Sequence, residues 1–306
     1  EEFVSQLLGM GILKEELKKG KEPFYHCMKI GGICIKLCGP ADIFPKQFAS
    51  FFCEEEEADQ IIEVKVLVPA NKPNGNILIR NKEMSICECD EGYLVLFHQM
   101  KNVLEGYMTK DGSYVRIHAL MPQNEEEKDN FFHAIRLFYL YLAQKKGFYV
   151  IHSASILYQN RAWLFSGHSG MGKSTHTELW HERVHTPYLN GDLNLVGIEN
   201  GKLKVYGMPW CGTSGIFTTS TQELGGIVLL GRDDYDHLER LGEAEKIVRV
   251  MQRMISPAWT EEQMEKNLDF AGQIVENSPV YYLKCTKNPS AVETIKAQID
   301  QMEAEG

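Results

Sequence analysis

A glycine-rich stretch near the middle of the chain has the residues and the spacing to bind phosphate groups. It runs Gly167-His-Ser-Gly-Met-Gly-Lys-Ser-Thr175 and fits the pattern G-x-x-x-x-G-K-[ST] without a gap. In such a loop, glycines let the backbone curl so that successive N–H groups point into one concavity, and the next helix adds partial positive charge. Lys173 would reach the β- and γ-phosphates, and the Ser174 hydroxyl would help to hold Mg²⁺. The stretch therefore predicts a nucleoside triphosphate site formed by Gly167, Ser169, Gly170, Met171, Gly172, Lys173, Ser174 and Thr175.

Two further residues could act on a bound triphosphate together with Lys173. Phosphoryl transfer needs a carboxylate that holds metal or accepts the proton of the attacking hydroxyl. Asp192 follows Lys173 by 19 residues, at the end of a predicted strand, and is the candidate for both roles. The alternative is an ordinary aspartate in an Asn-Gly-Asp turn. His152 could reach the phosphates as a donor or proton acceptor, and a simply packed histidine is the equally weighted alternative.

The elements around the loop constrain the fold. Residues 149–158 and 161–166 look like strands and are separated only by Gln159-Asn160, which demands a tight turn and an antiparallel pair. The second strand enters the loop, and a helix over 175–182 leaves it. In the common GTPase and RecA-type folds the loop strand has parallel neighbours, so this hairpin argues against those folds. We expect an α/β domain with a mixed or antiparallel sheet.

The first part of the chain has a different pattern. Apolar residues at helical spacing predict an amphipathic helix within residues 1–21, and alternation of period two over residues 24–121 predicts an antiparallel β-rich module. A polar segment at 122–128 suggests a boundary, with domains at 1–123 and 124–306. The strongly apolar helix expected at 131–142 should be buried between the two halves.

The order of these motifs resembles a known family. His152-Ser-Ala, a short hairpin, the glycine-rich loop, a helix and Asn190-Gly-Asp192-Leu resemble the catalytic domain of HPr kinase/phosphorylase and the wider phosphoenolpyruvate-carboxykinase-like kinases. The resemblance covers residues 148–306. It implies a phosphoenolpyruvate-carboxykinase-like P-loop domain, preceded here by the β-rich domain. It also implies ATP and Mg²⁺ as cofactors, with His152 near the phosphates, Lys173 and Ser174 on ATP and Mg²⁺, and Asp192 on metal and acceptor hydroxyl.

The sequence departs from the family in two places. The family has two consecutive acids where this chain has Gly191 and Asp192, and HPr kinases carry a Glu-x-Arg-Gly stretch where this chain has Lys204-Val-Tyr-Gly207. HPr is therefore disfavoured as a substrate. We expect a divergent kinase that phosphorylates a serine-like hydroxyl of a small molecule or peptide. The alternative is an ATP-binding regulatory protein of the same fold without transfer activity. Because family members assemble as oligomers, the resemblance also leaves a homo-oligomer open.

Two more segments are weaker candidates near the site. Pro209, Trp210, Cys211 and Gly212 stand where the acceptor should enter, so they form either a substrate-gating loop with Trp210 as a contact surface or a turn followed by a core tryptophan. Arg232, in a predicted surface turn, is an outside candidate for a phosphate contact.

Composition excludes several classes of function. The formal charge of −10 over 306 residues argues against nucleic-acid or anionic-membrane partners, which reward a basic surface. No apolar run reaches the length that spans a bilayer, so we expect a cytoplasmic location. Eight cysteines are too sparse for a disulfide scaffold and lack paired zinc spacing, which predicts reduced, structural thiols.

Overall fold

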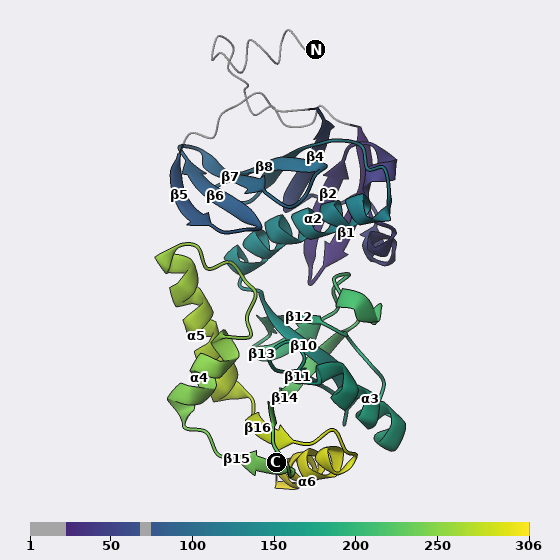
Figure 1. Ribbon diagram of the computed structural model, residues 1–306, viewed down its shortest axis with the longest axis vertical. Helices are drawn as coiled ribbons and strands as arrows, with labels where there is room; N and C mark the ends of the chain where they lie inside the picture. Colours follow the sequence, from purple (N-terminus) through teal and green to yellow (C-terminus); the bar gives the residue numbers. More distant parts are fainter. Residues whose placement is uncertain (1–22, 68–74, 306) are drawn as a thin grey trace. The chain divides into compact units, whose positions relative to one another are not determined.

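The protein has a mixed α/β architecture built on two large sheets (Figure 1). The computed structural model describes residues 23–67 and 75–305. The helix predicted within residues 1–21 lies outside the described residues. The chain divides into two compact units, Glu1–Lys146 and Gly147–Gly306. This division falls after the apolar helix rather than at residues 123–124, where the polar segment suggested it.

The first unit contains a nine-stranded sheet in the order β3-β1-β2-β4-β9-β8-β7-β6-β5. Most neighbours are antiparallel, but β4 is parallel to both β2 and β9, so the expectation of a wholly antiparallel module is wrong at the centre of the sheet. Two short 3₁₀ helices separate β2 from β3. The elements are β1 (Phe24–Ile30), β2 (Ile33–Cys38), η1 (Ala41–Ile43), η2 (Lys46–Phe51), β3 (Phe52–Cys53), β4 (Gln60–Val66), β5 (Asn76–Arg80), β6 (Met84–Cys89), β7 (Gly92–Phe97), β8 (Val103–Thr109) and β9 (Tyr114–Ala119).

Helix α2 (Glu125–Lys145) belongs to the first unit, because its apolar side packs on that sheet. The Asn124 side chain caps its N-terminus by accepting from the backbone N–H of Glu127. Phe138 lies against Gly106 of β8, where an added methyl group would come within 2.2 Å of the ring. The buried Gln60 side chain donates to the Phe138 carbonyl at 3.2 Å. The helix is thus part of the first unit, whereas the polar segment predicted that it belongs with residues 124–306.

The second unit holds a seven-stranded mixed sheet whose first five strands close on themselves. Strand β11 pairs antiparallel with β10, as the Gln159-Asn160 turn predicts, and parallel with β14. Together with the pairs β10–β12, β12–β13 and β13–β14 this forms a ring of five strands. The expectation that the loop strand lacks a parallel neighbour is therefore wrong on its β14 side. The strands are β10 (Tyr149–Tyr158), β11 (Arg161–Ser166), β12 (Leu193–Glu199), β13 (Lys202–Tyr206), β14 (Thr221–Arg232), β15 (His237–Glu239) and β16 (Val280–Cys285).

Helices cover the second sheet and complete two apolar cores. One core joins strand residues to Phe270 and Ile274 of α5, and the other joins Trp163 and Phe165 to Trp180 of α3. A capping box at Thr260 and Gln263 begins α5. The helices are α3 (Lys173–Val184), α4 (Glu243–Met251), α5 (Glu261–Asn277) and α6 (Ser290–Glu305), with a 3₁₀ turn, η3 (Gly212–Ser214).

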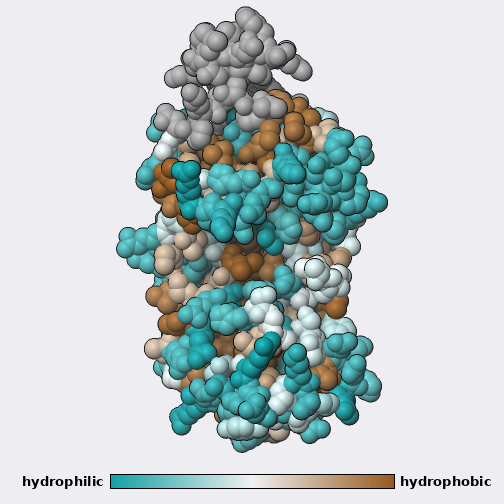
Figure 2. Space-filling view, viewed as in Figure 1, coloured by the Kyte–Doolittle hydropathy of each residue, from teal (hydrophilic) through white to brown (hydrophobic). Residues whose placement is uncertain are grey.

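The surface in view is mostly polar, with apolar side chains showing between polar ones (Figure 2). The exposed large apolar residues of the second unit include Ile198, Val248, Met264 and Leu268. Single exposed apolar residues are normal on a folded protein and do not by themselves mark an interface. Across the part of the chain that the structure describes, no helix is both long and apolar enough to cross a bilayer.

Candidate functional site

The glycine-rich loop forms an open cradle between β11 and α3. β11 ends at Ser166 and α3 begins at Lys173. Gly170 and Gly172 have φ angles of +74° and +98°, which side chains rarely adopt. A methyl group at either position would meet no atom within 4 Å, so the space next to these two glycines is open. No side chain caps the N-terminus of α3, which leaves its first N–H groups available to an anion.

Lys173 lies over the loop that precedes it. Its Nζ donates to the Gly167 carbonyl at 3.5 Å. Partial burial lowers the pKa of Lys173, the nearby Asp192 carboxylate raises it, and the Arg253 guanidinium lowers it further. Lys173 therefore has one negatively charged neighbour, Asp192, and one positively charged neighbour, Arg253. Ser169, Ser174 and Thr175 are exposed on the loop and the first turn of α3.

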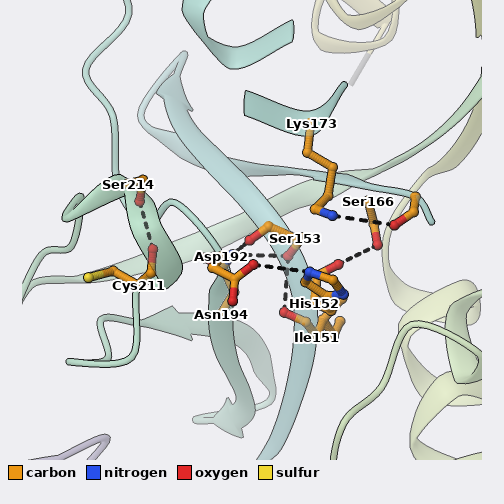
Figure 3. A network of polar contacts seen from close by, with 10 residues as sticks. Ile151, His152, Ser153, Ser166, Lys173, Asp192, Asn194, Cys211 and Ser214 are labelled. Atoms are coloured by element: carbon orange, nitrogen blue, oxygen red, sulfur yellow. Dashed lines mark hydrogen bonds and ion pairs between the residues drawn. The ribbon is translucent and has the colours of Figure 1, made fainter. Parts of the chain in front are cut away.

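The structure brings His152 and Asp192 together. Strand β10 pairs with β12 in a register that sets His152 opposite Leu193, directly after Asp192. His152 Nε2 lies 3.0 Å from Asp192 Oδ1, and each side chain is 32% exposed (Figure 3). In the same view Lys173 is drawn above this pair. The Asp192 carboxylate is near enough to raise the pKa of Lys173. An accessible histidine–carboxylate pair beside a phosphate loop can accept and pass on a proton.

A buried polar network beneath the pair fixes its position. Asn194 Nδ2 donates to the Ser153 carbonyl at 2.7 Å, and Asn194 Oδ1 accepts from Ser155 Oγ at 2.7 Å and from Asn190 Nδ2 at 2.9 Å. Ser166 Oγ, at the end of β11, donates to the His152 carbonyl at 2.6 Å. These bonds tie the turn that carries Asp192 to β10 and to the loop strand. No motif in the sequence predicted this network, but small polar residues alternating in the otherwise apolar strand β10 are its signal.

Two arginines add positive charge at the loop. Arg253 lies in a segment that runs along β10, where its carbonyl accepts from the His152 N–H at 2.8 Å. Its Nη2 lies 3.4 Å from His168 Nε2 on the loop. Arg232, at the end of β14, donates to the Gly170 carbonyl at 2.5 Å. Arg253 was missed because it follows helix α4, far along the chain from every motif.

The segment predicted to admit the acceptor lies partly in the core. Trp210 is 1% exposed, so it is a core tryptophan and not an exposed contact surface. Pro209 and Cys211 are buried as well, whereas Gly212 is exposed. A methyl group on Gly212 would come within 3.0 Å of the Asp192 side chain. The η3 turn that Gly212 begins is thus the part of this segment that lies against the candidate carboxylate.

Gly191, directly before Asp192, lies where the surroundings leave no room for a side chain. A methyl group there would come within 1.9 Å of Ser214 Oγ and 2.8 Å of Ser214 Cβ. Ser214 Oγ is itself held by the Cys211 carbonyl at 2.7 Å. The serine therefore occupies the space that a side chain at position 191 would need.

The residues present suit magnesium better than a softer metal. Asp192 and Ser174 offer oxygen donors, and proteins usually hold Mg²⁺ with one or two carboxylates plus phosphate oxygens of the substrate. Within the described residues, no group of three or more histidine, cysteine, aspartate or glutamate side chains gathers as a metal site. The protein donors fit an ion that arrives with a nucleotide.

Comparisons with known proteins give little help with identity. No family model matches the chain, and no curated protein matches it. Among solved structures, the chain is similar to the Hpr(Ser) kinase/phosphatase from Coxiella burnetii. That match has 12% sequence identity and a TM-score of 0.32, and it covers 51% of this chain and 99% of the other. Because similarity at this level assigns no residue roles, any function of this chain has to be argued from its own residues.

Proposed function

We propose that the protein is an ATP- and Mg²⁺-dependent kinase that transfers the γ-phosphate to a serine-like hydroxyl of a small molecule or peptide. The observation that carries this proposal is the His152–Asp192 pair beside the loop of Lys173: the two side chains lie 3.0 Å apart, with His152 on β10 and Asp192 directly before β12. A phosphate cradle alone would serve any nucleotide-binding protein. A paired acid and base at its edge is what transfer to a hydroxyl additionally needs.

Each residue has a defined part in this reaction. The loop amides, Lys173 and Arg253 hold the phosphates and offset their charge. The acceptor hydroxyl gives its proton to Asp192, whose carboxylate His152 orients. The acceptor oxygen then bonds to the γ-phosphorus while the bond from that phosphorus to the β–γ bridging oxygen breaks and ADP leaves. Mg²⁺, held by Asp192, Ser174 and phosphate oxygens, would supply charge neutralisation.

The test is transfer from Mg·ATP labelled at the γ-phosphate to panels of hydroxylated small molecules and serine peptides. Asp192→Asn should keep ATP affinity but lower the transfer rate by about 10²–10⁴-fold, because it removes the proton acceptor. Lys173→Ala, in contrast, should lower the affinity for ATP. Asp269→Asn, an exposed acid on α5, is the matched control and should behave as wild type. A wild-type protein that binds ATP tightly and phosphorylates no acceptor would rule out the kinase.

A second candidate is an ATP-binding regulator without transfer activity. The observation that favours it is Ser214, which fills the space where the family's first acid would stand beside Gly191. ATP binding should then change the protein without consuming the nucleotide. Limited proteolysis with ATP and with a non-hydrolysable analogue would give the same protection pattern, and no ADP would form over hours.

A further inference from the structure

Three parallel strands of the second unit end at one edge of the sheet, beside the phosphate loop. β14 is parallel to β11 on one side and to β16 on the other. Ser166 at the end of β11 lies opposite Leu229, and Arg232 at the end of β14 lies opposite Cys285 at the end of β16. In α/β sheets, ligands bind in the crevice beyond the carboxyl ends of parallel strands.

A cavity of about 510 Å³ opens at this edge. Met171 of the loop lines it, together with residues at and after the ends of β14 and β16: Arg232, Asp233, Asp234, Cys285, Thr286 and Lys287. The lining thus carries two acidic and two basic side chains. Its volume falls within the range of roughly 300–1,000 Å³ typical of small-molecule sites. The cavity is therefore large enough for a nucleoside and adjoins the predicted phosphate cradle directly.

The phosphate cradle has different neighbours on its two sides. On one side of β11 lies β10, which carries His152, and next to β10 lies β12, which Asp192 directly precedes; this pair marks the proposed place of transfer. β14 and β16, on the other side, end at the cavity. A triphosphate whose last phosphate points towards Asp192 would have its nucleoside end on the side of β14.

We propose that this cavity holds the base and ribose of the nucleotide and that two of its lining residues, Asp233 and Asp234, select ribonucleotides. The inference rests on the proposed nucleotide binding and adds the location and the selectivity of the nucleoside site.

The lining suits both parts of a nucleoside. Met171 and Cys285 present sulfur, which packs well against aromatic rings. Burial, with a smaller contribution from Asp236, raises the pKa of the Cys285 thiol to about 11, so this wall is uncharged at neutral pH. Carboxylates such as those of Asp233 and Asp234 accept hydrogen bonds from ribose hydroxyls, as an acidic residue does in dinucleotide-binding folds.

The lining is also held in place. The Thr286 N–H and hydroxyl donate to Asp236 Oδ1 at 2.7 Å and 3.0 Å, and the Asp233 N–H donates to the Cys285 carbonyl at 3.2 Å. These bonds connect the segments that follow β14 and β16. The backbone of Asp233 is therefore held close to the end of β16.

Calorimetric titration of the full chain with three ligands in Mg²⁺ tests the inference: ATP, 2′-deoxyATP and inorganic tripolyphosphate, which has the phosphates without the nucleoside. Asp234→Trp places a ring in the cavity mouth, and we expect ATP affinity to fall by about tenfold or more while tripolyphosphate affinity is unchanged or slightly higher. Glu265→Trp, at an exposed acid of α5, is the matched control and should leave all three affinities unchanged.

The isosteric double variant Asp233→Asn with Asp234→Asn tests the ribose contact. Wild type should prefer ATP over 2′-deoxyATP by roughly tenfold, the value of one hydrogen bond to a charged group, and the double variant should lose most of that preference.

The outcomes separate this inference from the proposed function. Equal losses of ATP and tripolyphosphate affinity in Asp234→Trp, or no loss of either, would overturn the nucleoside site while leaving the phosphate cradle standing. An equal preference for ATP and 2′-deoxyATP in wild type would overturn the ribose contact. Wild type that binds neither ATP nor tripolyphosphate would overturn the cradle, and the nucleoside site with it.

Discussion

At the scale of single residues, the site concentrates positive charge in an acidic protein. The chain carries a net charge of −10, yet Lys173, Arg232 and Arg253 gather at one loop. Burial and Arg253 lower the pKa of Lys173, and Asp192 opposes them. Asp192 therefore stabilises the charged lysine until a phosphate arrives, and a triphosphate would then relieve the mutual repulsion of the cations.

A buried histidine on α3 should make the second unit sensitive to acid. His176 is 4% exposed, its Nε2 accepts from Trp180 Nε1 at 3.2 Å, and burial lowers its pKa from 6.5 to about 4. Between these values the unfolded chain binds a proton that the folded chain does not, so stability present above pH 6.5 is lost as the pH falls towards 4. The loss should reach about 3 kcal/mol at most.

Urea unfolding between pH 4 and pH 7, followed by tryptophan fluorescence, measures this effect, because all four tryptophans lie in the second unit. His176→Gln keeps an acceptor for Trp180 and should flatten the pH dependence. His237→Gln, at a partly exposed histidine of β15, is the control and should leave the pH dependence of stability unchanged. If the stability of His176→Gln falls between pH 7 and pH 4 as steeply as that of wild type, His176 is not the cause of the acid sensitivity.

At the scale of elements, the η3 turn controls the surroundings of Asp192. Its first residue, Gly212, lies against the carboxylate, and its last, Ser214, lies against Gly191. The Gly191 N–H also donates to the Ile216 carbonyl at 2.9 Å. The turn and the Asn-Gly-Asp segment are thus packed as one unit, and an acidic side chain at position 191 would displace the turn.

Complementary substitutions test this packing. Gly191→Ala should destabilise the second unit by about 1–3 kcal/mol through overpacking, and Gly191→Asp should do so at least as strongly without adding activity. Combining Gly191→Ala with Ser214→Gly removes the clash. The double variant should therefore be more stable than the sum of the two single effects predicts. A double-mutant cycle by thermal unfolding gives the coupling, and simple additivity would show that the two positions do not meet.

At the scale of the whole molecule, the chain consists of two units with separate cores. The apolar face of α2 packs against the first sheet, and its residues Phe131, Phe138 and Tyr139 are fully buried. The second unit holds the loop, His152, Asp192, both arginines and the cavity beyond β14 and β16. Every residue that the proposed reaction uses therefore lies within residues 147–306.

Fragments cut at the two possible boundaries should behave differently. A fragment of residues 147–306 keeps its entire sheet and should unfold cooperatively and bind ATP. A fragment of residues 124–306 carries α2 without its sheet, so it should bind the dye ANS and self-associate. Size-exclusion chromatography and ANS fluorescence compare the two. If the fragment of residues 147–306 aggregates while the fragment of residues 124–306 neither self-associates nor binds ANS, the boundary lies at residues 123–124.

Local patterns in the sequence were enough for the loop between β11 and α3 and for the β10–β11 hairpin. The conformations of a glycine-rich loop and of a two-residue turn depend on only a few neighbouring residues. They can therefore be predicted without knowing the rest of the fold. The same is true of the strand periodicity in the first unit, although not of the parallel pairings of β4.

Contacts between distant segments were decided only by the tertiary structure. Arg253 beside His152, Ser214 in the space next to Gly191, the parallel β11–β14 pair and the placement of α2 on the first sheet each join residues far apart in the chain. A period of two or 3.6 shows which face of an element is buried but does not identify its partner. Partner choice depends on packing across the whole unit, which no single stretch of sequence encodes.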